Sequence, residues 1–390
     1  MPNDKDRTPP SGAGGDAPAR RLKVLELGTQ FGVGGITRHV RLLGDWLRAR
    51  GHEVTFGGTP DAWGGPDRDP GFVVLPTRYV AGDGGSMPAR LRHLAVAVWR
   101  LRRWLRRHRP DLIHAHESAP CLVADLARKG LGIPLAVTYH GSEPERVAAF
   151  ASIASRADLV ITPSHRSGED LVGRGGLARG KLKVMGLGLP PAPAADPAEV
   201  AALRARLLGD GERVIVTIAR MVPQKGIDIL IGVAAELRAR RPGYRFVVVG
   251  DGPDEDALKA LARGRGVLGT LHFAGRTATP HLYLRAADLF LLTSRWEALP
   301  FTIVEAFQAG TPAVATACSG VVELIDATVG ATPPVGDVAA IAAAVEAILE
   351  DEPRRAAMAG SALARSREDR FDLGWVHARF EETYRALARR

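Results

Sequence analysis

The feature that most constrains the fold of this chain is an alternation of short apolar and amphipathic segments, which occurs twice. The first series runs from LKVLELG to KLKVMGLG, and the second runs from RVIVTIA to TPAVAT. Short apolar strands separated by helical segments are typical of a parallel, doubly wound sheet. A stretch rich in proline and alanine, LPPAPAADPAEV at 189–200, separates the two series. The sequence therefore predicts an α/β protein with two Rossmann-like domains joined by a short linker.

Chain length and composition agree with two domains. A chain of 390 residues exceeds what one hydrophobic core normally covers, and a hydrophobic content of 46% supplies apolar side chains for two cores. The expected segments, in chain order, are a disordered leader at 1–20, a first domain at 21–190, a linker at 191–205, a second domain at 206–372 and a terminal helix at 373–390.

The sequence shows no signal segment and no cysteine motif. It has no apolar run of about 18 residues, and residues 1–20 contain no apolar signal segment. Cys121 and Cys318 lie far apart and belong to no CxxC or His/Cys cluster, so we expect neither a disulfide nor structural zinc. These observations predict a cytoplasmic protein.

Two glutamates bracket a turn that opens into a helix in the segment TSRWEALPFTIVEAFQAG. Residues 289–293 have the pattern of a buried strand, and Pro300 stands where a chain can enter the first turn of a helix. Glu297 therefore lies on a loop beside a helix N-terminus, and Glu305 lies inside that helix. The free N–H groups and the dipole of a helix N-terminus attract an anion, while carboxylates accept hydrogen bonds from sugar hydroxyls. This layout predicts a nucleotide-sugar site.

The residues around these glutamates resemble the signature of glycosyltransferase family 4, the retaining GT-B enzymes, written S-x-x-E-G-x-P…E-A-x-A-x-G-x-P-V-V-A…G-G-x-x-E. The matching residues are Ser294, Glu297, Pro300, Glu305, Ala306, Gly310, Pro312, Val314, Ala315 and Glu323. The chain departs from the signature at Ala298 and Ser319, where the family prefers glycine. The resemblance covers nearly the whole chain after residue 21. It implies the GT-B fold, in which two Rossmann-like domains face each other across a cleft and a terminal helix crosses back onto the first domain.

Two cations follow a predicted strand and precede a predicted helix in the segment IARMVPQKG. Arg220 and Lys225 can therefore converge on a diphosphate at a helix N-terminus, where an arginine fork and a lysine point charge complement each other. The segment is similar to the family's G-R-x-x-x-x-K-G, with Ala219 in place of glycine.

The resemblance implies a role for each of these residues. Arg220 and Lys225 would bind the diphosphate, Glu297 the hydroxyls of the donor sugar and Glu305 the ribose. The backbone N–H groups of Phe301, Thr302 and Ile303 would add to the phosphate site.

Further donor-binding candidates lie at the ends of other predicted strands. His140 ends the segment LAVTYHG at the sheet edge where ligands collect, and a similar His-Gly of the family contacts the donor sugar or its phosphate. Gly34 and Gly35 open a helix, so the backbone can closely approach a phosphate or sugar ring. Gly250 ends a strand, and Phe273 lies in the segment whose backbone reads the nucleobase in the family.

The acceptor site is predicted from acids and histidines of the first half. His116 and Glu117 end the segment IHAHE, and Glu143 follows His140 closely, so we expect these three residues to contact the acceptor. A core or capping role is an equal alternative for His116. With Asp61, Asp67, Asp69 and Asp83, the glutamates could suit a cationic acceptor such as an aminocyclitol.

A strongly basic segment stands out in the first half, which carries most of the net charge of +9. Eight arginines and no acid occur between Arg90 and Arg109. A helix here would place on one face Leu91, Leu94, Val98, Leu101 and Leu105, with Trp99 and Trp104 beside them. We favour a solvated helix packed on its sheet over a helix that lies on an anionic membrane surface.

Together these features predict a retaining glycosyltransferase that moves a sugar from a nucleoside diphosphate sugar, UDP favoured and GDP possible, to a small soluble acceptor such as an aminocyclitol or another secondary-metabolite intermediate. We expect no cofactor and no nucleic-acid partner. We also expect no metal, since the DRD at 67–69 lies in a Pro/Gly-rich loop without a preceding strand. The alternatives are transfer to a lipid-linked acceptor at a membrane surface and a non-catalytic nucleotide-sugar-binding protein. A nucleotide-dependent oxidoreductase would need the G-x-G-x-x-G fingerprint with its acid, which this chain lacks.

Overall fold

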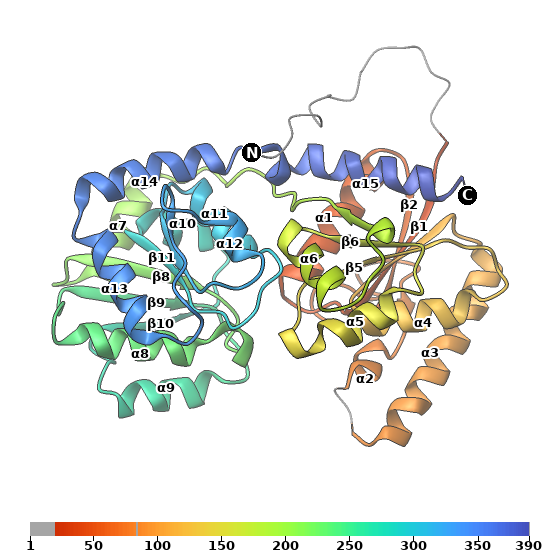
Figure 1. The fold of residues 1–390 in the computed structure, drawn as a ribbon, viewed down its shortest axis with the longest axis horizontal. Helices are drawn as coiled ribbons and strands as arrows, with labels where there is room; N and C mark the ends of the chain where they lie inside the picture. The colour runs from red at the N-terminus through yellow and green to blue at the C-terminus, as the bar shows by residue number, and fades with distance from the viewer. Residues whose placement is uncertain (1–19, 83–84, 390) are drawn as a thin grey trace, which may run out of the picture.

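The computed structural model describes residues 20–82 and 85–389 (Figure 1). The leader expected at 1–20 therefore lies outside the described residues, apart from Arg20, and so does Asp83.

Two separate parallel sheets organise the chain (Figure 1). The first has the order β3-β2-β1-β4-β5-β6-β7, with strands β1 Lys23–Gln30, β2 Glu53–Thr59, β3 Val73–Val74, β4 Leu112–His116, β5 Leu135–Thr138, β6 Leu159–Thr162 and β7 Leu182–Val184. The second has the order β10-β9-β8-β11-β12-β13, with strands β8 Arg213–Ile218, β9 Tyr244–Val249, β10 Leu271–Gly275, β11 Leu289–Leu292, β12 Ala313–Ala315 and β13 Gly330–Ala331. The predicted pair of doubly wound, Rossmann-like sheets is confirmed.

The helices of the first domain cover both faces of its sheet. They are α1 Gly35–Ala49, α2 Thr77–Ala81, α3 Met87–His108, α4 Ser118–Arg128, α5 Val147–Ala154 and α6 His165–Gly173. The sequence pattern did not indicate α4 or α6, which have 11 and 9 residues and follow closely after β4 and β6. Apolar residues at helical spacing, Val40, Leu43 and Leu47, bury one face of α1.

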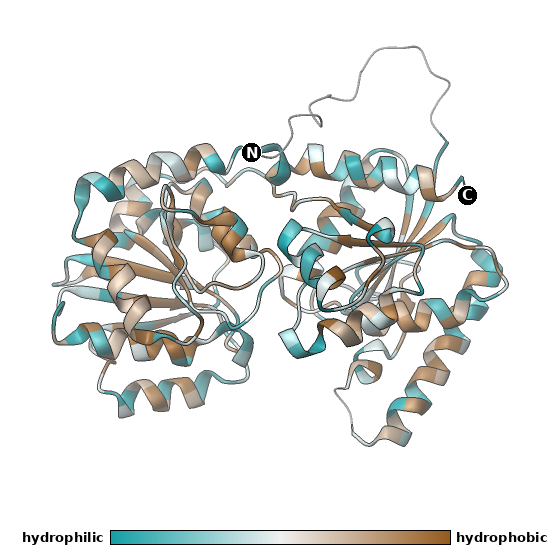
Figure 2. Cartoon of the chain, viewed as in Figure 1, coloured by the Kyte–Doolittle hydropathy of each residue, from teal (hydrophilic) through white to brown (hydrophobic). Residues whose placement is uncertain are grey.

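The second domain has a similar arrangement. Its helices are α7 Pro197–Leu208, α8 Ile227–Arg238, α9 Glu255–Gly264, α10 Pro280–Ala286, α11 Phe301–Gln308, α12 Val321–Leu324, α13 Val338–Leu349 and α14 Glu352–Arg365. Helix α7 begins inside the Pro/Ala-rich segment, since the Asp196 carboxylate caps it by accepting from the Ala198 N–H at 2.9 Å. Figure 2 shows apolar strands inside both halves and polar residues on the outward helix faces.

The last helix, α15 Leu373–Leu387, runs from the end of α14 across to the first domain (Figure 1). Val376, Phe380 and Tyr384 are buried in the same core cluster as Val24 of β1 and Leu43 of α1. The end of the chain is therefore part of the first domain's core.

Helix α3 matches only part of its predicted apolar face. Leu101 and Leu105 are fully buried and Trp104 packs against the core. The prediction for Leu91 was wrong, since 59% of this residue is exposed. Leu91 lies in the first turns of α3, which extend beyond the sheet (Figure 1). No helix of the described residues combines the length and the apolar character needed to cross a membrane.

Candidate active site

The loop between β11 and α11 lies against the first domain at the carboxyl ends of its strands. Ser164 Oγ, after β6, donates to the Ala298 carbonyl at 3.1 Å, and the backbone N–H of Arg166 donates to Glu323 Oε2 at 3.0 Å. Gly141, after β5, has φ +90°, and a Cβ at this position would lie 2.8 Å from the Ala298 nitrogen. Only glycine fits there. The two domains therefore make contact at the carboxyl ends of the first domain's strands, where ligands bind in open α/β folds.

Glu297 is held by two donors in this loop. Lys225 Nζ donates to Glu297 Oε1 at 2.5 Å, and Ser294 Oγ donates to the same oxygen at 2.7 Å. The Glu297 side chain is only 7% exposed, so Lys225 offsets the cost of burying its charge. The other oxygen, Oε2, has no hydrogen-bond partner among the described residues and can accept from a ligand hydroxyl.

Arg220 differs from Lys225, although both lie between β8 and α8. Its side chain is exposed, and no described residue forms an ion pair with it. Lys225 ends a 3-10 turn at Pro223–Lys225, and Gly226, with φ +60°, is the N-cap that precedes α8. One cation is therefore anchored to a carboxylate, and the other is available to an anion.

The N-terminus of α11 offers backbone donors. The N–H groups of Phe301 and Thr302 donate to no described residue, whereas the Ile303 N–H donates to the Pro300 carbonyl at 3.3 Å. The side chain of Ile303 is buried in the core. Of the three predicted N–H donors, the first two are thus open at the positive end of the helix dipole.

Glu305 is paired with a residue that the sequence analysis missed. Arg38 of α1 donates to Glu305 Oε1, and its guanidinium lies 5.4 Å from the centre of the Phe301 ring. The glycines before it bring α1 close to α11, because a Cβ at Gly35 would lie 3.4 Å from the Phe301 ring, while Gly34 has open space around it. A cation in the first turn after a glycine loop was the available signal.

Gly250 and Phe273 have structural explanations. A Cβ at Gly250 would lie 2.0 Å from the Ala219 carbonyl oxygen, so the packing of two strand ends requires glycine. The Phe273 ring packs against the core of the second domain, and Lys259 Nζ lies 5.9 Å from its centre. The half-buried Phe273 side chain is thus engaged with the core.

His140 and His116 form a chain of hydrogen bonds with Glu26 of β1. His116 Nδ1 and His140 Nε2 are 3.0 Å apart, and His116 Nε2 lies 2.8 Å from Glu26 Oε2. His116 and Glu26 are fully buried, whereas His140 is half-buried. The His116 ring is buried and both of its nitrogens are occupied, so His116 has the core role that was the alternative to contact with an acceptor.

Two further residues complete this buried network. His114 Nδ1 lies 3.1 Å from Glu26 Oε2, and Tyr384 of α15 donates to Glu26 Oε1 at 3.0 Å. Burial favours a neutral Glu26, but the charge and hydrogen bonds of His114 and His116 outweigh it and lower the pKa of Glu26. Burial, reinforced by His114, lowers the pKa of His116 to about 4. A single glutamate inside the apolar segment LKVLELG was the only sequence signal for Glu26.

The predicted acceptor acids occupy different environments. Glu117 is half-buried at the end of β4 with φ +78°, an unusual value for a residue with a side chain, and burial raises the pKa of its carboxyl group. Glu143 is more exposed and pairs with Arg146 at 2.9 Å. Asp69 is buried and accepts from Arg41 at 2.6 Å, so it is already used by the fold.

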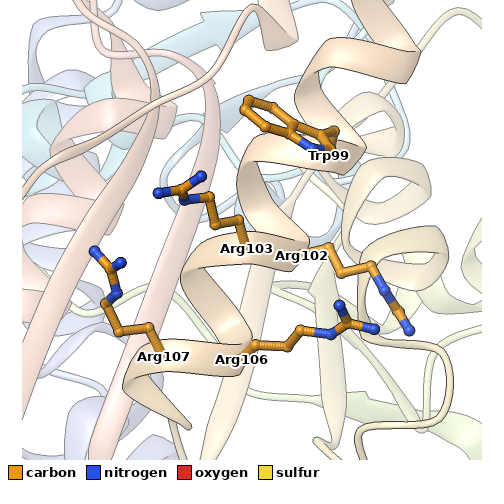
Figure 3. Close-up of a pocket in the computed structure, with 5 residues that line it drawn as sticks. All are labelled: Trp99, Arg102, Arg103, Arg106 and Arg107. Atoms are coloured by element: carbon orange, nitrogen blue, oxygen red, sulfur yellow. The ribbon is translucent and has the colours of Figure 1, made fainter.

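A hollow on α3 lies apart from these residues. It is lined by Trp99, Arg102, Arg103, Arg106 and Arg107, none of which is a predicted site residue (Figure 3). Arg103 and Arg107 point to one side of α3, and Arg102 and Arg106 point to the other. Arg102 Nη1 donates to the Ala127 and Lys129 carbonyls at 2.9 and 2.8 Å, so it caps the end of α4.

Models of known families match both halves of the chain. The one described as Glycosyltransferase Family 4 matches residues 33–192, and the one described as Glycosyl transferases group 1 matches residues 201–365.

Two relatives are similar over most of their length. A phosphatidyl-myo-inositol mannosyltransferase from Mycolicibacterium smegmatis is 29% identical over 374 residues, or 91% of each chain. A D-inositol 3-phosphate glycosyltransferase from Rhodococcus jostii is 30% identical over 348 residues, or 77% of this chain and 75% of the relative. A solved structure, sucrose-phosphate synthase from Thermosynechococcus elongatus, shares the fold with a TM-score of 0.79 at 20% identity, over 94% of this chain and 99% of that one.

Proposed function

The chain belongs to glycosyltransferase family 4, with a second half of the glycosyl transferases group 1 type, and from this premise we propose a retaining, metal-independent enzyme. It moves a sugar from a nucleoside diphosphate sugar, with UDP favoured and GDP possible, to a hydroxyl of a small soluble acceptor. The observation that carries the proposal is the arrangement of Lys225, Glu297 and Glu305 around the open N-terminus of α11.

In this proposal the donor diphosphate binds between Arg220, Lys225 and the N–H groups of Phe301 and Thr302. Glu297 accepts a hydrogen bond from a sugar hydroxyl through its free Oε2, while Lys225 stays paired with Oε1. The ribose hydroxyls bind Glu305 and displace Arg38, whose guanidinium then turns toward the diphosphate.

The chemistry that these residues support is departure of the diphosphate. Negative charge develops on its leaving oxygen as the glycosidic bond breaks. Lys225 and the backbone N–H groups, which the fold holds in place, stabilise that charge, and Arg220 and Arg38 join them once the donor is bound. Contacts between the loop after β11 and the first domain limit access of water to this region. Because protein cations perform the neutralisation, we propose that the reaction needs no divalent metal.

We propose a cyclitol as the soluble acceptor. The names of both relatives include an inositol, and Glu117 and Glu143 lie in the first domain near the carboxyl ends of β4 and β5. Burial raises the pKa of Glu117, so a cationic amine on an aminocyclitol would find a carboxylate that gains from being paired.

A lipid-linked acceptor is the second candidate. Helix α3 carries exposed Trp99 and several arginines that pair with no described residue, and one relative is named for a phosphatidyl-inositol. We favour the soluble acceptor because α3 lies on the side of the first domain turned away from the second domain (Figure 1).

Mass spectrometry of reactions between a panel of sugar nucleotides and a panel of cyclitols and inositol lipids tests the proposal. We expect a glycosylated cyclitol with retained anomeric configuration by NMR, formed at an undiminished rate in excess chelator. Nucleotide-sugar binding without any product would favour the non-catalytic alternative. Activity that chelator abolishes and Mg²⁺ restores would contradict metal independence.

A further inference from the structure

We propose that Glu26 and His116 are positioning residues that hold His140 in its Nε2–H tautomer, so that His140 Nδ1 acts only as a hydrogen-bond acceptor for a substrate hydroxyl. The substrate part of this proposal rests on the proposed function, whereas the tautomer does not.

The strand register brings these groups onto one face of the first sheet. Glu26 of β1 is paired in register with His114 of β4, and His116 is paired with Thr138 of β5. Since side chains alternate along a strand, His114 and His116 share a face, and Glu26 faces the same side. Near the amino ends of these strands the same face carries the apolar residues of the core that contains α15. The face becomes polar only toward the carboxyl ends, beside His140.

The direction of each hydrogen bond follows from the carboxylate. An ionised carboxylate can only accept, so His116 Nε2 donates to Glu26 across 2.8 Å. A neutral imidazole has one donor and one acceptor, which makes His116 Nδ1 the acceptor. His140 Nε2 must then donate to it across 3.0 Å. The lone pair of His140 therefore resides on Nδ1, which no described residue contacts by a hydrogen bond.

The hydrogen bonds from Glu26 through His116 to His140 require an ionised carboxylate and two neutral imidazoles, and the pKa values of these groups are shifted in that direction. The pKa of Glu26 is lowered, and burial lowers the pKa of His116 to about 4. Burial, with His116 and His39 nearby, also lowers the pKa of His140 well below 6.5. At neutral pH the order is thus a carboxylate followed by two neutral imidazoles.

The consequence for the site is selectivity in hydrogen bonding. Which nitrogen of a histidine carries the proton is set by the bond that the other nitrogen makes. A His140 fixed in this way accepts from a hydroxyl and cannot donate to a phosphate oxygen through Nδ1. We therefore assign His140 to a hydroxyl of the donor sugar or acceptor and not to the diphosphate.

Tyr384 provides a matched control. It donates to Oε1 of Glu26, and its hydroxyl also lies 2.5 Å from Nδ1 of His114. Tyr384→Phe removes both contacts, but neither belongs to the path from Glu26 Oε2 through His116 to His140. Glu26→Gln alters that path, because an amide can either accept from His116 or donate to it. The second option reverses both histidine bonds and places a proton on His140 Nδ1.

Side-chain ¹⁵N NMR of the full-length, ¹⁵N-labelled protein at pH 7.5 tests the proposal, with His140 assigned through His140→Gln. We expect protonated Nε2 and unprotonated Nδ1 for His140 in the wild type and in Tyr384→Phe, and a mixture of tautomers in Glu26→Gln. Turnover should fall about tenfold in Glu26→Gln, the scale seen when a partner that orients a functional histidine is lost. Tyr384→Phe should keep turnover close to that of the wild type.

Three results would overturn the proposal. The first is a wild-type His140 protonated at Nδ1. The second is equal His140 spectra in wild type and folded Glu26→Gln. The third is a stoichiometric metal in the purified protein, because Glu26, His114 and His116 bring possible ligand atoms within 4.8 Å, and a metal would replace the proton on His116. The wild-type spectrum decides the matter even if Glu26→Gln does not fold. A protein that shows the expected tautomer but transfers no sugar would refute only the proposed function.

Discussion

The proposed diphosphate site can be tested at its two cations, Arg220 and Lys225, one residue at a time. Arg220→Ala and Lys225→Ala should each lower turnover by about 10²–10³, the scale for removing one preorganised donor to developing charge. Lys225→Ala should also lower thermal stability, because it leaves the nearly buried Glu297 without its cation. Steady-state kinetics with the matched donor measure the first effect, and thermal unfolding measures the second.

The control for this test is Arg263→Ala, which removes an exposed cation of α9 in the same domain. It should leave both properties unchanged. Turnover close to wild type in both Arg220→Ala and Lys225→Ala would refute the assignment of the diphosphate site.

A sharper prediction concerns Arg38, because in the structure without ligand it is paired with Glu305. If Arg38 leaves Glu305 for the diphosphate when donor binds, Arg38→Ala should lower kcat/KM for the donor by about 10–100-fold, since a hydrogen bond to a charged group contributes roughly 1.5–3 kcal/mol. Arg38→Lys keeps the charge but loses the planar fork, so it should restore only part of the activity. Donor binding that becomes tighter in Arg38→Ala would show instead that Arg38 only competes for Glu305.

Among the elements, α3 decides between the two acceptor classes. We expect no sedimentation with anionic vesicles at about 0.15 M salt, where screening acts over roughly 8 Å. A helix that docks on membranes should bind in a salt-sensitive way, since each arginine near an anionic surface contributes about 1 kcal/mol. The informative variant combines Arg103→Glu with Arg107→Glu, because these side chains are exposed and share one side of α3 (Figure 3).

Arg102 is unsuitable for this test, because charge reversal there would also remove the cap of α4. Vesicle binding that stimulates transfer, and that the double variant abolishes, would replace the soluble acceptor with a lipid-linked one. Charge-neutral vesicles provide the control for apolar adsorption through Trp99.

For the whole molecule, buried histidines predict how stability depends on pH. Burial lowers the pKa of His377 from 6.5 to about 4, against the opposing charges of Glu26 and Asp372, and burial also lowers the pKa values of His39 and His140 well below 6.5. As pH falls below 6.5, the unfolded chain binds protons that the folded protein does not. The free energy of unfolding should therefore be highest above pH 6.5 and fall by about 1.4 kcal/mol per pH unit for each such histidine.

Urea unfolding between pH 5 and 7.5 measures this slope. His377→Phe should reduce this slope by the contribution of about one proton. Phe keeps a ring beside Trp46 and Phe380 and removes two nitrogens that have no described partner. His272→Gln, which changes an exposed residue of β10, should leave the slope unchanged. An unaltered slope in His377→Phe would contradict the prediction.

The sequence by itself determined the elements and the local site on the second domain. Apolar segments and their spacing indicated both sheets, because the period of burial is a local property of each strand and helix. The turn between Glu297 and Glu305 was also local, since a strand, a loop and a helix N-terminus follow one another within twenty residues.

The tertiary structure alone decided which distant groups meet. Arg38 and Glu305 are 267 positions apart, and Glu26 and Tyr384 are 358 apart, so no periodicity links them. The burial of His116 depends on β1 and β5 lying on either side of β4 and on α15 covering that face. The return of the last helix was expected only from the family resemblance. Sheet order is set by the sum of long-range packing, because burying apolar faces is favourable wherever they fit and is not written in any one segment.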